Sequence, residues 1–223
     1  MTSHIKDLVV PVAGFSRLTG LYDPVMSWLM RERVWKARLV EQVAPNAGER
    51  ILDLGCGTGT LTIMLHRACP DAEVVGLDVD RNILRMARAK ADAAGVAVSF
   101  WQGRADDPSN VPMLRPASFD KIVSSLLFHH LSTERKRITF AHAATLLCTG
   151  GTIHVADWGE PRSRLMRLMF YPVQALDGLA NTSDNVRGLL PEFMHEAGLA
   201  DVFETHSQRT ALGSLSFYRG TKR

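Results

Sequence analysis

The chain has 223 residues, of which 46% are hydrophobic and 22% charged, and a formal net charge of +3. This composition is ordinary for a globular protein of one domain, and the mild charge neither requires nor rules out nucleic acid. Three cysteines at unrelated positions exclude a disulfide framework and the spacing of a cysteine metal site. The N-terminus lacks the pattern of a signal peptide, and no apolar run approaches the roughly eighteen residues of a transmembrane helix. We therefore expect a cytoplasmic protein.

The spacing of apolar residues predicts alternating strands and helices from residue 48 onward. The strands are expected at 50–54, 73–77, 97–102, 119–125, 151–156, 200–206 and 214–220. The helices are expected at 60–68, 81–94, 132–147 and 186–197, the third of them closing at a Gly150-Gly151 cap. This order predicts an α/β fold with a Rossmann-like, doubly wound sheet of seven strands, mostly parallel with an antiparallel final strand, and helices on both faces.

A single domain is expected over residues 1–223, with two segments outside its regular core. Residues 1–47 would form an N-terminal helical cap on a core at 48–157, and residues 158–185 an insertion before a C-terminal helix and antiparallel strand pair at 186–223. Both segments are rich in Met, Leu and aromatic residues, which favours either simple cover for the sheet edge or an apolar lid over a ligand site. Residues 26–40 are amphipathic, which is compatible with contact at a membrane surface.

Glycines at alternating positions follow the first predicted strand. Gly55, Gly57 and Gly59 permit positive φ angles and let a ligand approach bare main chain, and the next helix offers unpaired N–H groups at its start. Asp78 ends the second strand about twenty residues further on, where an acidic side chain usually grips a ribose diol. The two features together predict a site for a nucleoside-containing cofactor.

The sequence Leu-Asp-Leu-Gly-Cys-Gly-Thr-Gly at residues 52–59 resembles motif I of the class I S-adenosylmethionine-dependent methyltransferases. Its third glycine comes one residue earlier than in the dinucleotide fingerprint, which disfavours a nicotinamide-dependent oxidoreductase. Runs at 100–105, 118–124 and 146–151 continue the resemblance, so that it covers roughly residues 48–157. The resemblance implies S-adenosyl-L-methionine as the cofactor and S-adenosyl-L-homocysteine as the product. No metal is expected, because Asp157 is not followed by the second carboxamide or carboxylate of a divalent-metal O-methyltransferase.

The family's cofactor-binding positions carry over to residues of this chain. Asp53 would hold the cofactor's ammonium group, Asp78 both ribose hydroxyls, and Val79 would lie against the adenine. The other expected contacts are the backbone of Gly55, Cys56, Gly57, Thr58 and Gly59, the adenine edge at Gly103, Arg104 and Ala105, the carbonyl of Ser124, and Tyr22 closing over the cofactor. Arg104 departs from the family's common Gly-Asp-Ala, so the adenine amino group needs another acceptor, either Asp106 or a backbone carbonyl.

Methyl transfer requires alignment of the acceptor with the methyl group and, where the acceptor carries a proton, a base. His129 and His130 directly follow the fourth strand and have the pKa range of a general base. Asp157 ends the fifth strand, where it would orient a histidine or act as a second base. In related small-molecule methyltransferases these runs carry catalytic or substrate-contacting groups. The alternative is structural: one histidine caps the following helix and the other packs.

The subgroup that the chain most resembles is the ubiquinone/menaquinone-biosynthesis methyltransferases and their small-molecule relatives. That resemblance implies methyl transfer to a small apolar or aromatic acceptor, quinol-like, phenol-like or similar to a natural product, with attack by carbon, oxygen or nitrogen left open. The alternatives are a phospholipid-headgroup N-methyltransferase at the membrane surface and a non-catalytic protein that binds the cofactor. No nucleic-acid partner is expected, and the oligomeric state stays open, a homodimer included.

Overall fold

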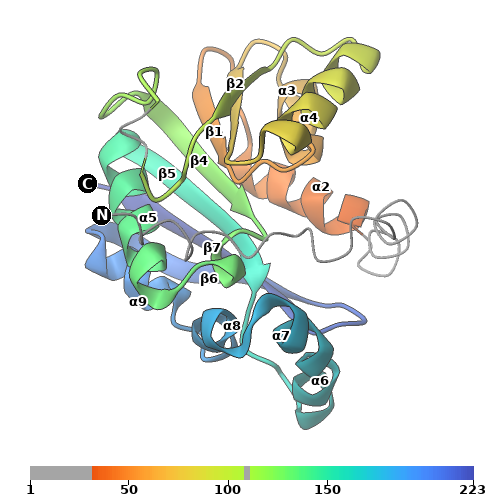
Figure 1. Cartoon of the computed structure of the whole chain (residues 1–223). Helices are drawn as coiled ribbons and strands as arrows, with labels where there is room; N and C mark the ends of the chain where they lie inside the picture. Colours follow the sequence, from red (N-terminus) through yellow and green to blue (C-terminus); the bar gives the residue numbers. More distant parts are fainter. Residues whose placement is uncertain (1–31, 108–110) are drawn as a thin grey trace, which may run out of the picture.

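The computed structural model describes residues 32–107 and 111–223, and Figure 1 shows a central sheet covered by helices. Its strands are β1 (Arg50–Leu54), β2 (Glu73–Asp78), β3 (Ser99–Gln102), β4 (Phe119–Ser125), β5 (Leu147–Trp158), β6 (Leu199–Arg209) and β7 (Ser214–Lys222). Its helices are α2 (Glu32–Val43), α3 (Thr60–Ala68), α4 (Arg81–Ala93), the short 3₁₀ helix η3 (Phe128–His130), α5 (Thr133–Leu146), α6 (Arg164–Met169), α7 (Tyr171–Asp177), α8 (Leu179–Val186) and α9 (Leu190–Glu196).

The seven strands lie in the order β3-β2-β1-β4-β5-β7-β6. All neighbours from β3 to β5 are parallel, and β7 is antiparallel to both β5 and β6. The predicted mostly parallel sheet with an antiparallel final strand is therefore confirmed. The strand order reverses between β1 and β4, and ligands of doubly wound proteins bind beyond the carboxyl ends of the strands at such a point.

Helices cover both faces of the sheet, as the sequence predicts. Successive residues of a strand point to opposite faces, and the buried strand residues divide accordingly. Ile51 packs with Trp35 of α2 and Leu61 of α3, whereas its neighbour Leu52 packs with Phe140 of α5 on the other face. Two apolar layers thus hold the sheet rigidly and fix the positions of its strand ends.

Two predicted boundaries are wrong. The helix α5 ends at Leu146, one residue before its predicted end, but the Gly150-Gly151 cap is wrong. The chain passes directly into β5, which begins at Leu147 and not at 151, and Leu147 pairs with Phe119 of β4. The last helix begins at Leu190 and not at 186, since Gly188 takes a positive φ of 69° and separates α8 from α9. The insertion expected at 158–185 accordingly folds as the three short helices α6, α7 and α8, just beyond the carboxyl end of β5 (Figure 1).

The part of the first segment within the described residues is mostly α2, whose Trp35 and Leu39 are fully buried against the sheet. Tyr22, expected to close over the cofactor, lies outside the described residues. Among the helices that the structure describes, none is long and apolar enough to cross a membrane.

Candidate active site

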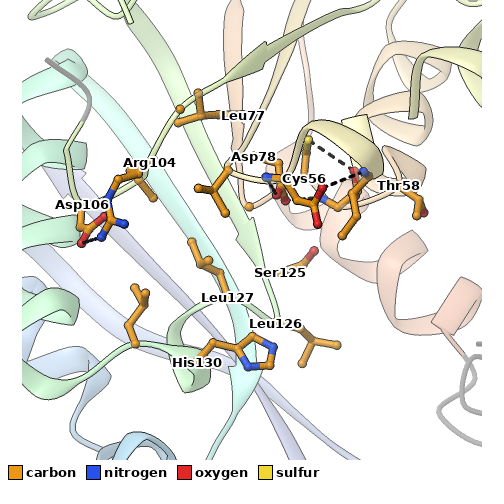
Figure 2. A pocket seen from close by; sticks show the side chains of 18 of the residues that line it. Cys56, Thr58, Leu77, Asp78, Arg104, Asp106, Ser125, Leu126, Leu127 and His130 are labelled. Atoms are coloured by element: carbon orange, nitrogen blue, oxygen red, sulfur yellow. Dashed lines mark hydrogen bonds and ion pairs between the residues drawn. The ribbon is translucent and has the colours of Figure 1, made fainter. Parts of the chain in front are cut away.

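A cavity of about 650 Å³ lies beyond the carboxyl ends of β1 to β4. Its walls come from the glycine loop, the ends of β2 and β4, the segment after β3, and η3 (Figure 2). This volume falls within the usual range of small-molecule and cofactor sites, roughly 300–1,000 Å³. The cavity therefore lies at the place where the strand order predicts a ligand.

Backbone conformation and backbone hydrogen bonds fix the shape of the glycine loop. Gly55, Gly57 and Gly59 all have positive φ, at 70°, 53° and 73°. The N–H groups of Gly55 and Cys56 donate to the carbonyl of Leu77 at 2.8 and 3.0 Å. A Cβ at Gly57 would meet nothing within 4 Å, whereas one at Gly59 would lie 2.7 Å from a ring carbon of Phe100. Gly57 thus leaves free space at the cavity, while Gly59 lets the loop pack on β3.

Asp78 joins the end of β2 to the loop. One of its carboxylate oxygens accepts the Gly57 N–H at 2.9 Å, and the other accepts the Asp80 N–H at 3.0 Å. Each carboxylate oxygen has a second lone pair, so both can still accept a hydroxyl from a ligand. Asp78 and its neighbour Val79 line the cavity, which is where a ribose and an adenine were predicted to lie.

Asp53 lies behind the cavity wall and is completely buried. Its Oδ2 accepts the Thr62 hydroxyl at 2.7 Å, while its Oδ1 has no hydrogen-bond partner among the described residues. Burial raises the pKa of this carboxyl from 3.8 to about 6. An unpartnered buried carboxylate oxygen next to the loop fits a cationic ligand group, reached directly or through a water molecule.

Ser124 is not part of the cavity lining. Its side chain is buried and donates to the carbonyl of Leu54 at 2.9 Å, and the lining residue is its neighbour Ser125. Gly103, Arg104 and Ala105 line the cavity as predicted.

Asp106, the suggested alternative acceptor for the adenine amino group, also lines the cavity. One of its oxygens pairs with Arg104 at 2.8 Å (Figure 2). The same oxygen pairs with Arg135 of α5 at 2.7 Å. The two guanidinium groups hold the Asp106 carboxylate in place at this end of the cavity.

His129 and Asp157 form a buried pair. The Nδ1 of His129 lies 2.8 Å from Oδ1 of Asp157, so that η3 and the end of β5 are joined. Asp157 also accepts the N–H of Phe128 at 2.7 Å, the N–H of Trp158 at 2.7 Å and the side-chain amide of Asn185 at 3.2 Å. A carboxylate oxygen accepts hydrogen bonds, so the contact between Asp157 and His129 requires the proton on Nδ1 of the histidine. The lone pair of His129 is therefore on Nε2.

His130 lies on the cavity wall, and its side chain is 42% exposed (Figure 2). Its ring centroid lies 3.9 Å from that of His129. Desolvation and the neighbouring His129 lower the pKa of His130, so that this ring stays neutral near pH 7. The two histidines thus differ: one is buried and supported by a carboxylate, and the other faces the ligand space.

Two residues of the insertion were missed by the sequence analysis. Asp177, at the end of α7, brings one oxygen to 3.7 Å from Nε2 of His129 and the other to 3.8 Å from Nδ1 of His130. Asn185, in α8, donates to both Asp157 and the carbonyl of Trp158. No motif marks either position, because their role depends on how the insertion folds back onto η3.

Polar contacts of Asp184 and Asn181 connect the helix α8 to α5. Lys136 is completely buried, and its ammonium group pairs with Asp184 at 3.0 Å and donates to the carbonyl of Asn181. Thr133 donates to the same oxygen of Asp184 at 2.7 Å. A buried ion pair therefore fixes the position of α8 next to η3.

The switch-point cavity, the glycine loop and Asp78 define an α/β protein that binds a nucleoside-containing cofactor. Comparison with known proteins narrows this class. A family model described as "Methyltransferase domain" matches residues 51–151. The chain is 32% identical over 158 residues to a demethylmenaquinone methyltransferase of Thermus thermophilus, covering 70% of this chain and 69% of that protein. A second demethylmenaquinone methyltransferase, of Symbiobacterium thermophilum, is 26% identical over 94% of this chain and 91% of its own length.

Among solved structures, a Thermotoga maritima protein described as a SAM-dependent methyltransferase and possible histamine N-methyltransferase superposes with a TM-score of 0.67. The two are 19% identical, and the match covers 94% of this chain and 98% of the other, so the likeness concerns the fold. The chain belongs to the class I S-adenosylmethionine-dependent methyltransferases. Membership of this family implies S-adenosyl-L-methionine as the methyl donor.

Proposed function

We propose that this enzyme methylates a small quinol-like or phenol-like acceptor, with His129 as the general base. The observation that carries the proposal is the His129–Asp157 pair, with the lone pair of Nε2 directed away from the carboxylate. The pair is buried directly behind the cavity wall, where the His129 ring lies 3.9 Å from that of His130, which lines the cavity. Asp157 fixes the tautomer and stabilises the imidazolium that forms when His129 takes a proton. His130, on the cavity wall, would orient the acceptor.

S-adenosyl-L-methionine supplies an electrophilic methyl group when it is bound. The residues proposed to hold it are the Gly55, Cys56 and Gly57 backbone for its methionine part, Asp78 for the ribose, and Gly103 to Ala105 for the adenine edge. The unpartnered Oδ1 of Asp53 supports a place for its ammonium group. The protein's own task is to align donor and acceptor and to receive one proton from the acceptor hydroxyl.

The apolar character of the cavity supports an aromatic acceptor. Leu126, Leu127 and Leu131 line it next to His130, and Trp35 lines it from α2. The curated relatives include demethylmenaquinone methyltransferases and a 2-phytyl-1,4-naphtoquinone methyltransferase, all named for methylation of a quinone ring. A hydroquinone meets both requirements, because it is flat and apolar and has a hydroxyl proton for a base to remove.

The two segments outside the core would wall the acceptor end. Residues 158–185 place Asp177 beside both histidines, and α2 places Trp35 on the cavity wall. The positions of Asp177 and Trp35 support a role for the insertion and the N-terminal cap in the acceptor site.

The first test is calorimetric titration with S-adenosylmethionine and S-adenosylhomocysteine, with NAD as the control. Micromolar binding of both sulfur nucleosides and none of NAD is expected.

The second test is a methyl-transfer assay in which the protein is incubated with a labelled methyl donor and with reduced naphthoquinols, simple phenols or amines as acceptors. Label on the quinols or phenols that disappears in His129→Ala supports the proposal, whereas label on amines alone contradicts it. Failure to bind either sulfur nucleoside would remove the cofactor assignment and every site role based on it.

A further inference from the structure

Three potential metal ligands converge where η3 meets the end of α7, and one of them, His130, also lines the cavity. The ligand atoms of His129, His130 and Asp177 all lie within 4.8 Å of one another. The two distances from the Asp177 oxygens, 3.7 Å to His129 Nε2 and 3.8 Å to His130 Nδ1, are too long for hydrogen bonds. Three acceptor atoms therefore face one small volume without bonding to one another.

The contact between His129 and the buried Asp157 carboxylate is one that many metal-binding histidines make. A histidine that binds a metal commonly donates its other ring N–H to a carboxylate, which fixes the ring orientation and raises its basicity as a ligand. Asp157 does this for His129 at 2.8 Å, and three further donors hold the Asp157 carboxylate itself in place. The Nε2 of His129 is thus oriented before any ligand arrives.

We propose that His129 Nε2, His130 Nδ1 and one oxygen of Asp177 bind a divalent transition-metal ion such as Zn²⁺. Ligand atoms about 2.1 Å from a tetrahedral ion lie roughly 3.4 Å apart, so the observed distances need only small side-chain shifts. Two imidazoles and a carboxylate suit Zn²⁺, Fe²⁺ and Co²⁺, whereas Mg²⁺ and Ca²⁺ take oxygen ligands. Three protein ligands leave a position free for water or another small ligand.

The proposed ion and the proposed base use the same lone pair. An ion on His129 Nε2 leaves this nitrogen unable to accept the acceptor's proton, so binding of the ion inhibits methyl transfer. The sequence-based expectation of no metal did not consider Asp177, which reaches the histidines only through the fold of the insertion. Ion binding can be measured without donor or acceptor, so its failure would leave the proposed function untouched.

The direct test is titration of the chelator-treated full chain with Zn²⁺ by calorimetry and with Co²⁺ by visible absorption. One ion per chain is expected, with the absorption of a tetrahedral Co²⁺ site. Asp177→Asn should weaken binding at least tenfold, and His130→Asn should do the same. Asp201→Asn is the matched control, since its carboxylate is exposed at the start of β6. His195→Ala controls for an exposed histidine.

Absence of stoichiometric binding would overturn the proposal. Equal weakening in Asp177→Asn and Asp201→Asn, or loss of binding in His195→Ala, would also overturn it, because the ion would then bind the surface. Circular dichroism of each variant separates loss of the site from loss of the fold.

A second arm measures turnover once an acceptor is known. Zn²⁺ should slow methyl transfer by the wild type and a chelator should restore it, while Asp177→Asn should need at least tenfold more Zn²⁺ for half inhibition. If Zn²⁺ instead accelerates transfer, the proposed competition is wrong.

Discussion

The two ends of the cavity are built in different ways. The cofactor end uses mainly backbone atoms from one continuous stretch, β1 to the end of β2, with Asp78 bonded directly to the Gly57 N–H at 2.9 Å. The acceptor end uses side chains from η3, the end of β5 and the insertion, so that His129, Asp157 and Asp177 meet only in the folded chain. A continuous loop thus forms the proposed cofactor end, and side chains from separate segments form the proposed acceptor end.

The sharpest test of this division is removal of the proposed base. His129→Ala should slow turnover by about 10²–10⁴-fold while leaving cofactor affinity near that of the wild type, because the base acts in the chemical step alone. Steady-state kinetics with the acceptor and calorimetry with S-adenosylhomocysteine measure the two effects separately. His195→Ala, on the exposed surface, is the control, and equal losses of turnover and cofactor affinity would contradict the division.

The next effect concerns Asp53 and pH. Burial raises its pKa in the folded protein to about 6, above the ordinary 3.8, so the protonated carboxyl favours folding and the ionised one opposes it. The free energy of unfolding of the wild type, relative to Asp53→Asn, should therefore fall by roughly 3 kcal/mol as the pH rises from about 4 to about 6, and level off above. Urea unfolding at several pH values measures this difference, and parallel pH profiles would refute the burial argument.

Loss of the Asp78 carboxylate should affect the cofactor end alone. Asp78→Ala should weaken binding of S-adenosylmethionine by about 1.5–3 kcal/mol, since a charge-assisted pair of hydrogen bonds to the ribose is lost. Asp92→Ala is the control, because this carboxylate is on the exposed side of α4 and does not line the cavity. An unchanged affinity in calorimetry would remove Asp78 from the site.

Substitution of two glycines of the loop should distinguish a position needed for packing from one needed for ligand binding. Gly57→Ala should cost about 1–2 kcal/mol of stability from its left-handed backbone alone. Gly59→Ala should cost about 1–3 kcal/mol more, since its Cβ would lie 2.7 Å from a ring carbon of Phe100 and 3.1 Å from Cβ of Ala87. Denaturant unfolding gives both values. Gly57→Ala is expected to be the more harmful to cofactor affinity, and the reverse order would show that the ligand does not approach Gly57.

The same contrast explains what the sequence could predict. The sheet and the glycine loop follow from short contiguous patterns, in which the apolar period and the glycines are local signals. The predicted contact from the Ser124 carbonyl stays a prediction, while its neighbour Ser125 is the residue that lines the cavity. Asp177 and Asn185 were missed, since no local signal shows that α7 and α8 return to η3.

The glycine loop contains a cysteine, Cys56, whose thiol is kept in its protonated form. Its thiol lines the cavity but is only 6% exposed, and burial, with the carboxylates of Asp53 and Asp78 nearby, raises its pKa. A thiolate is the nucleophilic form of cysteine, whereas a protonated thiol attacks electrophiles poorly. The loop can therefore carry a cysteine at the proposed donor site without offering a nucleophilic thiolate to the methyl group of the donor.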